Sequence, residues 1–202
     1  MGNWYTNICV KGTVQSDVVS LLDELGRRAY VTPDAGGWIV LYDQECDKFD
    51  LDELESLALT ISTKLSCTAL ASFNADDDIF WLGAYEDGRL ATRYSSDREQ
   101  FEDAADFPSN EEVAEVLCRI FAKPEKRKRV CKTLRTPHGV LGLLSHFLKI
   151  RLAYLFEVFR HRELAEVLGI PSGSVGLGYK YVDRGDSPPD MKREELRRTL
   201  SG

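Results

Sequence analysis

The sequence predicts an α+β protein, in which a ferredoxin-like antiparallel sheet with an extra hairpin is followed by a helical C-terminal half. Three observations predict this class. Segments typical of strands and helices alternate over residues 1–96, in the order strand, helix, strand, strand, helix, strand. A further hairpin follows those six segments. From residue 111 onward, apolar side chains recur at helical spacing instead.

The first elements follow from composition and period. WYTNICV (4–10) has the composition of a strand. Residues 14–28 predict a helix, because their apolar side chains stand at positions 14, 18, 21, 22 and 25. AYVT and WIVLYD flank PDAGG (33–37), whose composition is typical of a turn, and together they predict a hairpin.

The next elements complete the sheet. Asp50 is placed to cap a helix over 51–66, whose apolar positions form one stripe. TALASF (68–73) is typical of a strand and NADDD (74–78) of a turn. IFWLGAYE and RLATRYS are joined by Asp87-Gly88, a strong hairpin signal. The first six elements match the split β-α-β order, and a duplicated β-α-β-β unit is the alternative topology.

The second half predicts helices. We expect an acidic α+β sheet domain over 1–96, a linker over 97–110, and a basic, mainly helical region over 111–202 with a peripheral tail from about residue 186. Ser109 or Asn110 can cap the helix that follows the linker. The apolar stretch 139–159 holds three charged residues, so it predicts a helix buried in protein and no membrane span.

Charge is divided unevenly along the 202 residues, whose formal net charge is −7. Residues 1–110 hold 8 Lys and Arg against 21 Asp and Glu, and residues 111–202 hold 18 against 12. Such a division indicates either that the halves dock on each other or that the basic half binds an anionic partner, and we favour docking. Five dispersed cysteines and no leader-like N-terminus predict a cytoplasmic location.

A short stretch resembles a known DNA-binding element. ELAEVLGIPSGSV, residues 163–175, resembles the region-4 helix-turn-helix of extracytoplasmic-function sigma factors. In that family a second, basic helix follows and enters the major groove. Here Gly176 and Gly178 follow, and only Lys180 and Arg184 are basic, so the part that would contact DNA departs from the family's pattern.

A longer resemblance involves both ends of the chain. LGIP followed by the glycine-spaced segment VGLGYKYVDRG resembles the C-terminal end of uncharacterised bacterial proteins that also begin with a W-Y-x-N-I-like strand. The resemblance implies a bacterial, cytosolic protein and implies no activity. Gly176-Leu177-Gly178 is not a nucleotide-binding fingerprint, because that motif needs a preceding strand, a following helix and a third glycine.

Candidate site residues are few. The acidic turn could hold a divalent cation, although a solvated turn is the preferred interpretation; its members are Asp76, Asp77 and Asp78. Basic residues that could contact phosphates are Lys126, Arg127, Lys128, Arg129, Lys132, Lys180 and Arg184. Among the histidines, we expect His138 in a turn, His146 in the core and His161 exposed. No catalytic motif and no cofactor motif is present in the sequence.

These observations favour a non-enzymatic protein–protein interaction module, regulatory or inhibitory, that presents its acidic half to an unidentified protein partner. Trp4, Trp38 and Trp81 are the candidate anchors, unless they pack in the core. A nucleic-acid-binding regulator that uses the basic half is one alternative. An enzyme whose site is assembled from distant residues is the other. No membrane partner and no cofactor is expected.

Overall fold

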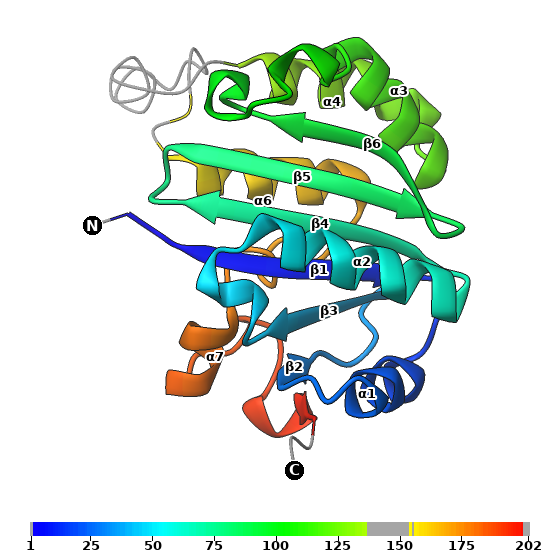
Figure 1. Ribbon diagram of the computed structural model, residues 1–202, viewed down its shortest axis with the longest axis vertical. Coiled ribbons are helices and arrows are strands. Elements are labelled where there is room, and N and C mark those ends of the chain that lie inside the picture. The colour runs from blue at the N-terminus through cyan, green and yellow to red at the C-terminus, as the bar shows by residue number, and fades with distance from the viewer. Residues whose placement is uncertain (1, 137–153, 155, 200–202) are drawn as a thin grey trace.

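The computed structural model describes residues 2–136, 154 and 156–199. Within these residues the chain forms an α+β fold with a seven-stranded antiparallel sheet and six α-helices (Figure 1). The predicted α+β class is therefore confirmed. The sheet is larger than the sequence predicts, because the C-terminal tail adds a seventh strand.

The strands lie in the order β6-β5-β4-β1-β3-β2-β7, and every neighbouring pair is antiparallel. Six of them stand where the sequence predicts strands. Their bounds are β1 (Tyr5–Lys11), β2 (Ala29–Val31), β3 (Trp38–Asp43), β4 (Thr68–Ala75), β5 (Ile79–Glu86), β6 (Arg89–Ser95) and β7 (Arg197–Arg198).

The seventh strand has no sequence signal of its own. Arg197 and Arg198 have no strand-like alternation, but they pair with Val31 and Tyr30 at the edge of the sheet. Thr199 holds the tail in place, since its backbone N–H donates to the Ala29 carbonyl at 3.0 Å and its hydroxyl accepts from the Ala29 N–H at 2.8 Å. The tail is ordered by this edge pairing rather than by its own composition.

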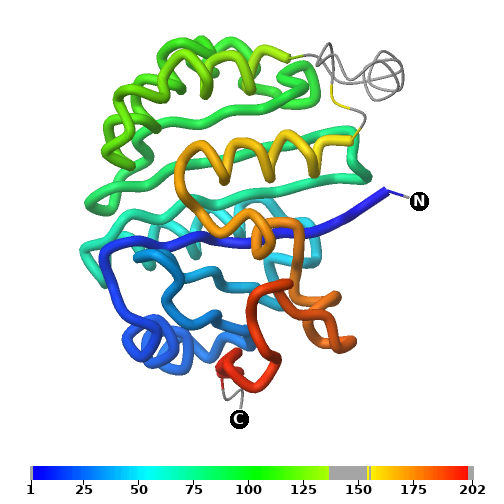
Figure 2. The backbone as a smooth tube through the Cα atoms, turned by 180° about the vertical axis from the view of Figure 1, so that it is seen from behind, coloured from blue at the N-terminus to red at the C-terminus, as the bar shows by residue number. Residues whose placement is uncertain are grey.

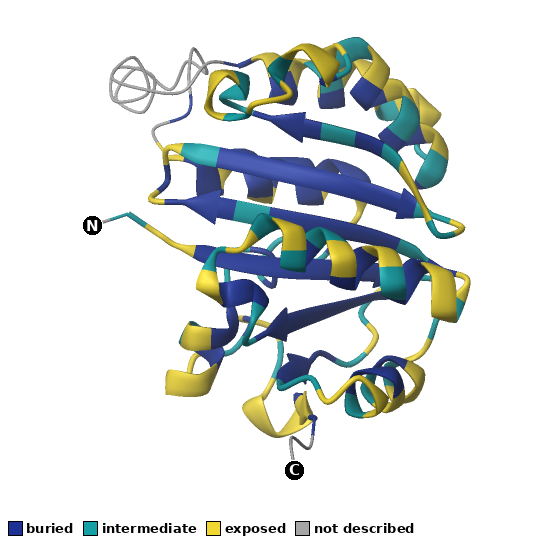
Figure 3. Cartoon of the chain, in the orientation of Figure 1, coloured by how far each residue is buried: buried dark blue, intermediate teal, exposed yellow. Residues whose placement is uncertain are grey.

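Two helices cover one face of the sheet, α1 (Gln15–Glu24) and α2 (Leu51–Leu65). Asp50 caps α2 as predicted, because its side chain accepts a hydrogen bond from the Glu53 N–H at 3.2 Å. Figure 3 shows exposed and half-buried residues on the outward side of α2, whereas Leu54, Leu57, Ala58 and Ile61 are buried. Residues 97–107 return to this face, where Phe107 is buried in the same core.

The remaining helices form a second core on the opposite face and at the β6 end of the sheet (Figures 1 and 2). They are α3 (Asn110–Ile120), α4 (Arg127–Arg135), α6 (Glu157–Leu168) and α7 (Tyr179–Arg184). Short 3₁₀ turns span Cys46–Lys48, Arg98–Gln100, Ala104–Asp106, Pro124–Lys126 and Arg193–Glu195. Ser109, one of the two residues predicted to cap this helix, caps α3, and Glu112 completes a capping box.

A buried arginine joins α6 to α4. The Arg160 guanidinium donates to the carbonyls of Thr133, Leu134 and Thr136 at 2.7, 3.0 and 2.6 Å, and to the Glu157 carboxylate at 2.6 Å. These carbonyls belong to the C-terminal end of α4, whose last carbonyls have no partner within the helix. Arg160 therefore closes α4 and fixes it against α6.

The apolar stretch that predicts a buried helix over 139–159 lies mostly outside the described residues, as do His138 and His146. Within the described part of the chain, no helix has the length and apolar character needed to cross a bilayer.

Candidate functional site

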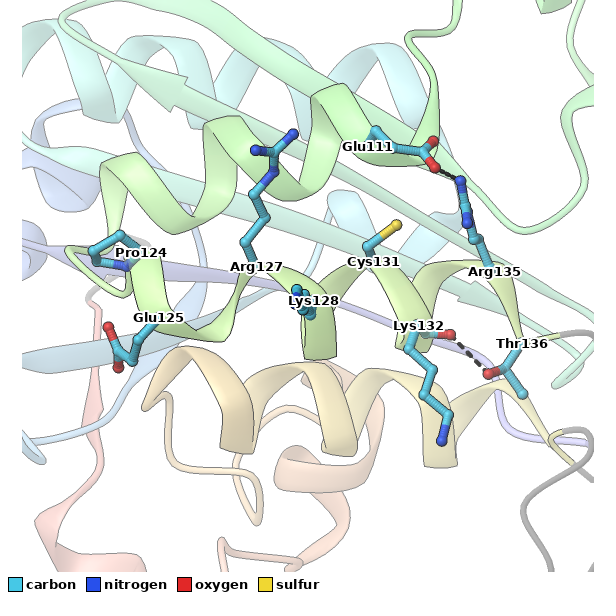
Figure 4. A pocket seen from close by; sticks show the side chains of 9 residues that line it. All are labelled: Glu111, Pro124, Glu125, Arg127, Lys128, Cys131, Lys132, Arg135 and Thr136. Atoms are coloured by element: carbon cyan, nitrogen blue, oxygen red, sulfur yellow. Dashed lines mark hydrogen bonds and ion pairs between the residues drawn. The ribbon is translucent and has the colours of Figure 1, made fainter.

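Three residues of the predicted basic run, Arg127, Lys128 and Lys132, lie on one exposed side of α4. This helix buries Val130, Thr133 and Leu134 against the second core. Its remaining side chains point outward because they lie on the opposite side of the helix. Figure 4 shows Arg127 on one side of this surface and Lys132 on the other, with Lys128 and Cys131 between them.

A surface hollow of about 840 Å³ lies over this side of α4 (Figure 4). Its lining residues are Glu111, Pro124, Glu125, Arg127, Lys128, Cys131, Lys132, Arg135 and Thr136. Two arginines are already engaged by α3, since Arg127 lies 3.0 Å from the Glu115 carboxylate and Arg135 is paired with Glu111. We call this feature the α4 hollow.

The other two predicted phosphate contacts lie elsewhere. Lys180 and Arg184 belong to α7, which packs against β1, β2 and β3, whereas α4 lies at the β6 end of the sheet (Figure 1). The Lys180 ammonium lies 4.4 Å from the centre of the Phe49 ring. The structure therefore brings Lys126, Arg127, Lys128, Arg129 and Lys132 together and separates them from Lys180 and Arg184.

A short helix follows the stretch whose sequence resembles a helix-turn-helix. α6 ends at Gly169, which adopts a left-handed conformation with φ of 80°. The helix that follows, α7, has six residues, and its Tyr179 and Val182 are buried in the core. Only the outer side of α7 is therefore available to a ligand.

The two spaced glycines before α7 allow close packing. A Cβ atom at Gly178 would lie 2.5 Å from the Asp47 carboxylate and 3.2 Å from the Tyr5 backbone. A Cβ atom at Gly176 would lie 2.9 Å from the Arg162 guanidinium, which ends a flexible, exposed side chain. The Asp47 carboxylate in turn accepts from the Lys180 N–H at 2.9 Å, and burial raises its pKa.

We expect Gly178→Ala to lower the free energy of unfolding by about 1–3 kcal/mol, because β1 and Asp47 cannot both move away from an added methyl group. Gly176→Ala is the matched control, and we expect its cost to stay below about 1 kcal/mol because Arg162 can rotate away. Urea unfolding of both variants measures the difference. Equal costs would contradict the close-approach explanation.

The acidic turn anchors the N-terminal segment. The Asp76 carboxylate accepts from the Gly2 N–H at 2.7 Å, and the Asp77 carboxylate accepts from the Asn3 N–H at 2.8 Å and from the Asn74 amide at 3.2 Å. Asp77 is buried, whereas Asp76 and Asp78 are exposed. A search of the described residues finds no group of three or more His, Cys, Asp or Glu side chains arranged to hold a metal ion.

The tryptophans divide between core and surface. Trp38 and Trp81 are 2% and 1% exposed, so core packing excludes both as anchors, whereas Trp4 is 41% exposed. The Trp4 ring meets Phe49 edge-on with centroids 4.8 Å apart, and Phe49 meets Phe73 at 5.9 Å. The backbone N–H of Trp4 donates to the Tyr181 hydroxyl at 3.4 Å. We call Trp4, Phe49, Phe73 and Tyr181 the aromatic patch.

His161 is buried, so the expectation that it is exposed is wrong. It is 2% exposed, its ring centre lies 4.6 Å from that of Phe80, and its Nδ1 lies 3.1 Å from the Tyr5 hydroxyl. Within the described residues its Nε2 has no hydrogen-bond partner. Burial, together with the nearby Arg162 charge, lowers the pKa of His161 to about 3.

The flanking arginines explain why the sequence misleads at His161. Arg160, His161 and Arg162 are consecutive, and such a run is typical of an exposed helix face. Arg160 is buried because it has specific acceptors at the end of α4, and His161 is buried because it faces the sheet. Only Arg162 reaches solvent.

A scan against protein-family models, a search of curated proteins and a search of solved structures each found nothing that matches this chain.

Proposed function

We propose that this chain is a non-enzymatic protein–protein interaction module that binds a basic partner protein through the aromatic patch. The observation that carries the proposal is the exposure of Trp4 on a surface where three other aromatic rings gather. Tryptophan and tyrosine dominate the energetics of protein interfaces, because they bury a large apolar area at a small entropic cost.

Charge supports a basic partner. The patch lies beside the N-terminal end of α2, where Asp50 and Asp52 are exposed, and beside the exposed Asp76. These carboxylates outnumber the Lys180 ammonium, which lies 4.4 Å from the centre of the Phe49 ring in the patch. The first 110 residues, which supply three of the four aromatic side chains, carry most of the chain's carboxylates. A rim of charge around an apolar centre is the usual arrangement of an interface, and complementary charge accelerates association.

Four finer predictions belong to the same proposal. The central strand order β4-β1-β3-β2, with α1 and α2 on one face, supports a ferredoxin-like core that β5, β6 and β7 extend. A cytoplasmic location is supported by the four buried thiols of Cys9, Cys46, Cys67 and Cys118. The bacterial resemblance and the division into two domains stay predictions.

The alternative, nucleic-acid binding, is less well supported by the geometry. Its candidate residues fall into two groups at different ends of the sheet, and α3 carboxylates already neutralise two of the α4 arginines. Counterion release from DNA requires several unneutralised cations on one continuous surface.

We expect Trp4→Ala to weaken partner binding by at least about 30-fold, which is the effect of losing an interface anchor. The tagged full chain is incubated with nuclease-treated and untreated extract of its source organism, and bound proteins are quantified by mass spectrometry. The affinity and salt dependence of any captured protein are then measured with both proteins purified.

Leu25→Ala is the matched control, because Leu25 is 40% exposed at the C-cap of α1 and lies outside the patch. A single stoichiometric protein that binds the wild type and Leu25→Ala, loses affinity for Trp4→Ala, and binds less tightly as salt is added would support the proposal. Equal capture by Trp4→Ala would contradict it. Capture that disappears after nuclease treatment would favour the nucleic-acid alternative instead.

A further inference from the structure

The outward side of α4 carries positive charge that the surrounding structure balances only in part. The nine residues of α4 include five basic side chains and no acidic one. Lys128 and Lys132 stand four residues apart, so their ammonium groups lie on the same side of the helix and repel each other. Such an arrangement is stabilised when an anion binds between the two charges.

The two lysines differ from the neighbouring arginines in their contacts. Arg127, Arg129 and Arg135 each have a carboxylate partner, respectively Glu115, Glu163 and Glu111. The ammonium groups of Lys128 and Lys132 form no ion pair and no hydrogen bond with the described residues of the chain. Both side chains are exposed and both line the α4 hollow.

The floor and the ends of the α4 hollow limit what can bind there. Pro124 and the Cys131 side chain provide apolar surface beside the two lysines. Glu125 lies toward the N-terminal end of α4, and Glu111 lies beside Arg135 near its C-terminal end (Figure 4). A long polyanion that followed α4 would approach these carboxylates, whereas a short one fits between them.

The geometry points to the α4 hollow as a binding site for a small ligand that carries two or more linked phosphate groups, with Lys128 and Lys132 as the principal contacts. The volume of about 840 Å³ lies within the range of small-molecule sites. Lysine binds phosphate as a mobile point charge, which suits two ammonium groups converging on one polyphosphate. This site is separate from the aromatic patch and does not depend on the proposed function.

Titration calorimetry with inorganic tripolyphosphate tests the site in the full-length chain. We expect saturable binding, and we expect the double variant Lys128→Gln/Lys132→Gln to weaken it at least about tenfold, since it removes two charge-assisted contacts. Lys48→Gln/Lys64→Gln is the matched control, because these exposed lysines lie outside the hollow and their loss changes the net charge equally. Trp4→Ala should bind tripolyphosphate as the wild type does.

Cys131 supplies an independent readout of position. It is the half-buried cysteine, while the other four are buried, so a maleimide should modify it first. Tripolyphosphate should slow this modification in the wild type and in the Lys48→Gln/Lys64→Gln control. It should leave the rate unchanged in Lys128→Gln/Lys132→Gln.

Three results would overturn the inference. The first is equal binding of sulfate at matched ionic strength, which would show general charge attraction. The second is unaltered tripolyphosphate affinity in Lys128→Gln/Lys132→Gln. The third is tighter, lysine-dependent binding of a single-stranded or duplex oligonucleotide, which would show that the surface accepts an extended polyanion.

Discussion

Arg160→Leu is expected to lower the free energy of unfolding by about 3–5 kcal/mol, among the largest effects of any single substitution in this chain. Arg160 is 2% exposed and Glu157 is fully buried, so the variant removes a buried ion pair at 2.6 Å. It also removes the donors that satisfy the carbonyls of Thr133, Leu134 and Thr136. Each unsatisfied buried carbonyl adds to the cost.

Urea unfolding measures this loss, and Arg162→Leu is the matched control. Arg162 is exposed on the same helix two residues away, so we expect its substitution to change the free energy by less than about 0.5 kcal/mol. A second variant, Arg160→Lys, keeps the charge but cannot reach four acceptors at once. We expect it to recover only part of the loss. If Arg160→Leu and Arg162→Leu are equally stable, Arg160 does not hold α4 against α6.

The elements that the sequence predicts correctly share one property: residues close to them in the sequence determine where they begin or turn. Asp87-Gly88 fixes a hairpin, and the structure has β5 and β6 on either side of it. Asp50 and Ser109 begin helices because their side chains accept a backbone N–H of the first turn. In each case the residues that determine the structure lie within a few positions of it.

The elements that the sequence does not predict depend on distant partners. Strand β7 exists because the edge of β2, far away in the sequence, offers free hydrogen-bonding groups to Arg197 and Arg198. His161 is buried because of Tyr5 and Phe80, which lie on two different strands. Periodicity within α6 cannot show these contacts, since nine of its twelve residues are buried and several of those nine are charged or polar.

The candidate sites divide in the same way. The basic run that supplies Arg127, Lys128 and Lys132 to the α4 hollow is continuous in the sequence, so these residues could be chosen in advance. The aromatic patch draws on the segment before β1, the turn before α2, β4 and α7. A composition-based interpretation could name Trp4 as one of three candidate anchors, and only the fold distinguishes it from the two buried tryptophans.

His161 is expected to make the protein less stable as the pH falls. In the folded state its pKa is about 3, against 6.5 for an unperturbed histidine, so it stays neutral in the folded chain and gains a proton in the unfolded chain between these values. The unfolded state then binds more protons, and the free energy of unfolding decreases with decreasing pH. The contribution of this one group is about 2 kcal/mol at pH 5 and about 4 kcal/mol at pH 3.

The variant His161→Phe isolates this contribution, because carboxylates elsewhere titrate in both proteins and cancel in the difference. Phenylalanine keeps an aromatic ring against Phe80 and has no proton to gain. It loses the hydrogen bond to the Tyr5 hydroxyl, which lowers stability by a similar amount at every pH. Urea unfolding from pH 7.5 to 4.5 should therefore show the wild type losing stability more steeply, with the two curves converging toward acid pH. Parallel curves would mean that His161 can be protonated within the folded protein, and that its environment between β1, β5 and α6 is open to solvent.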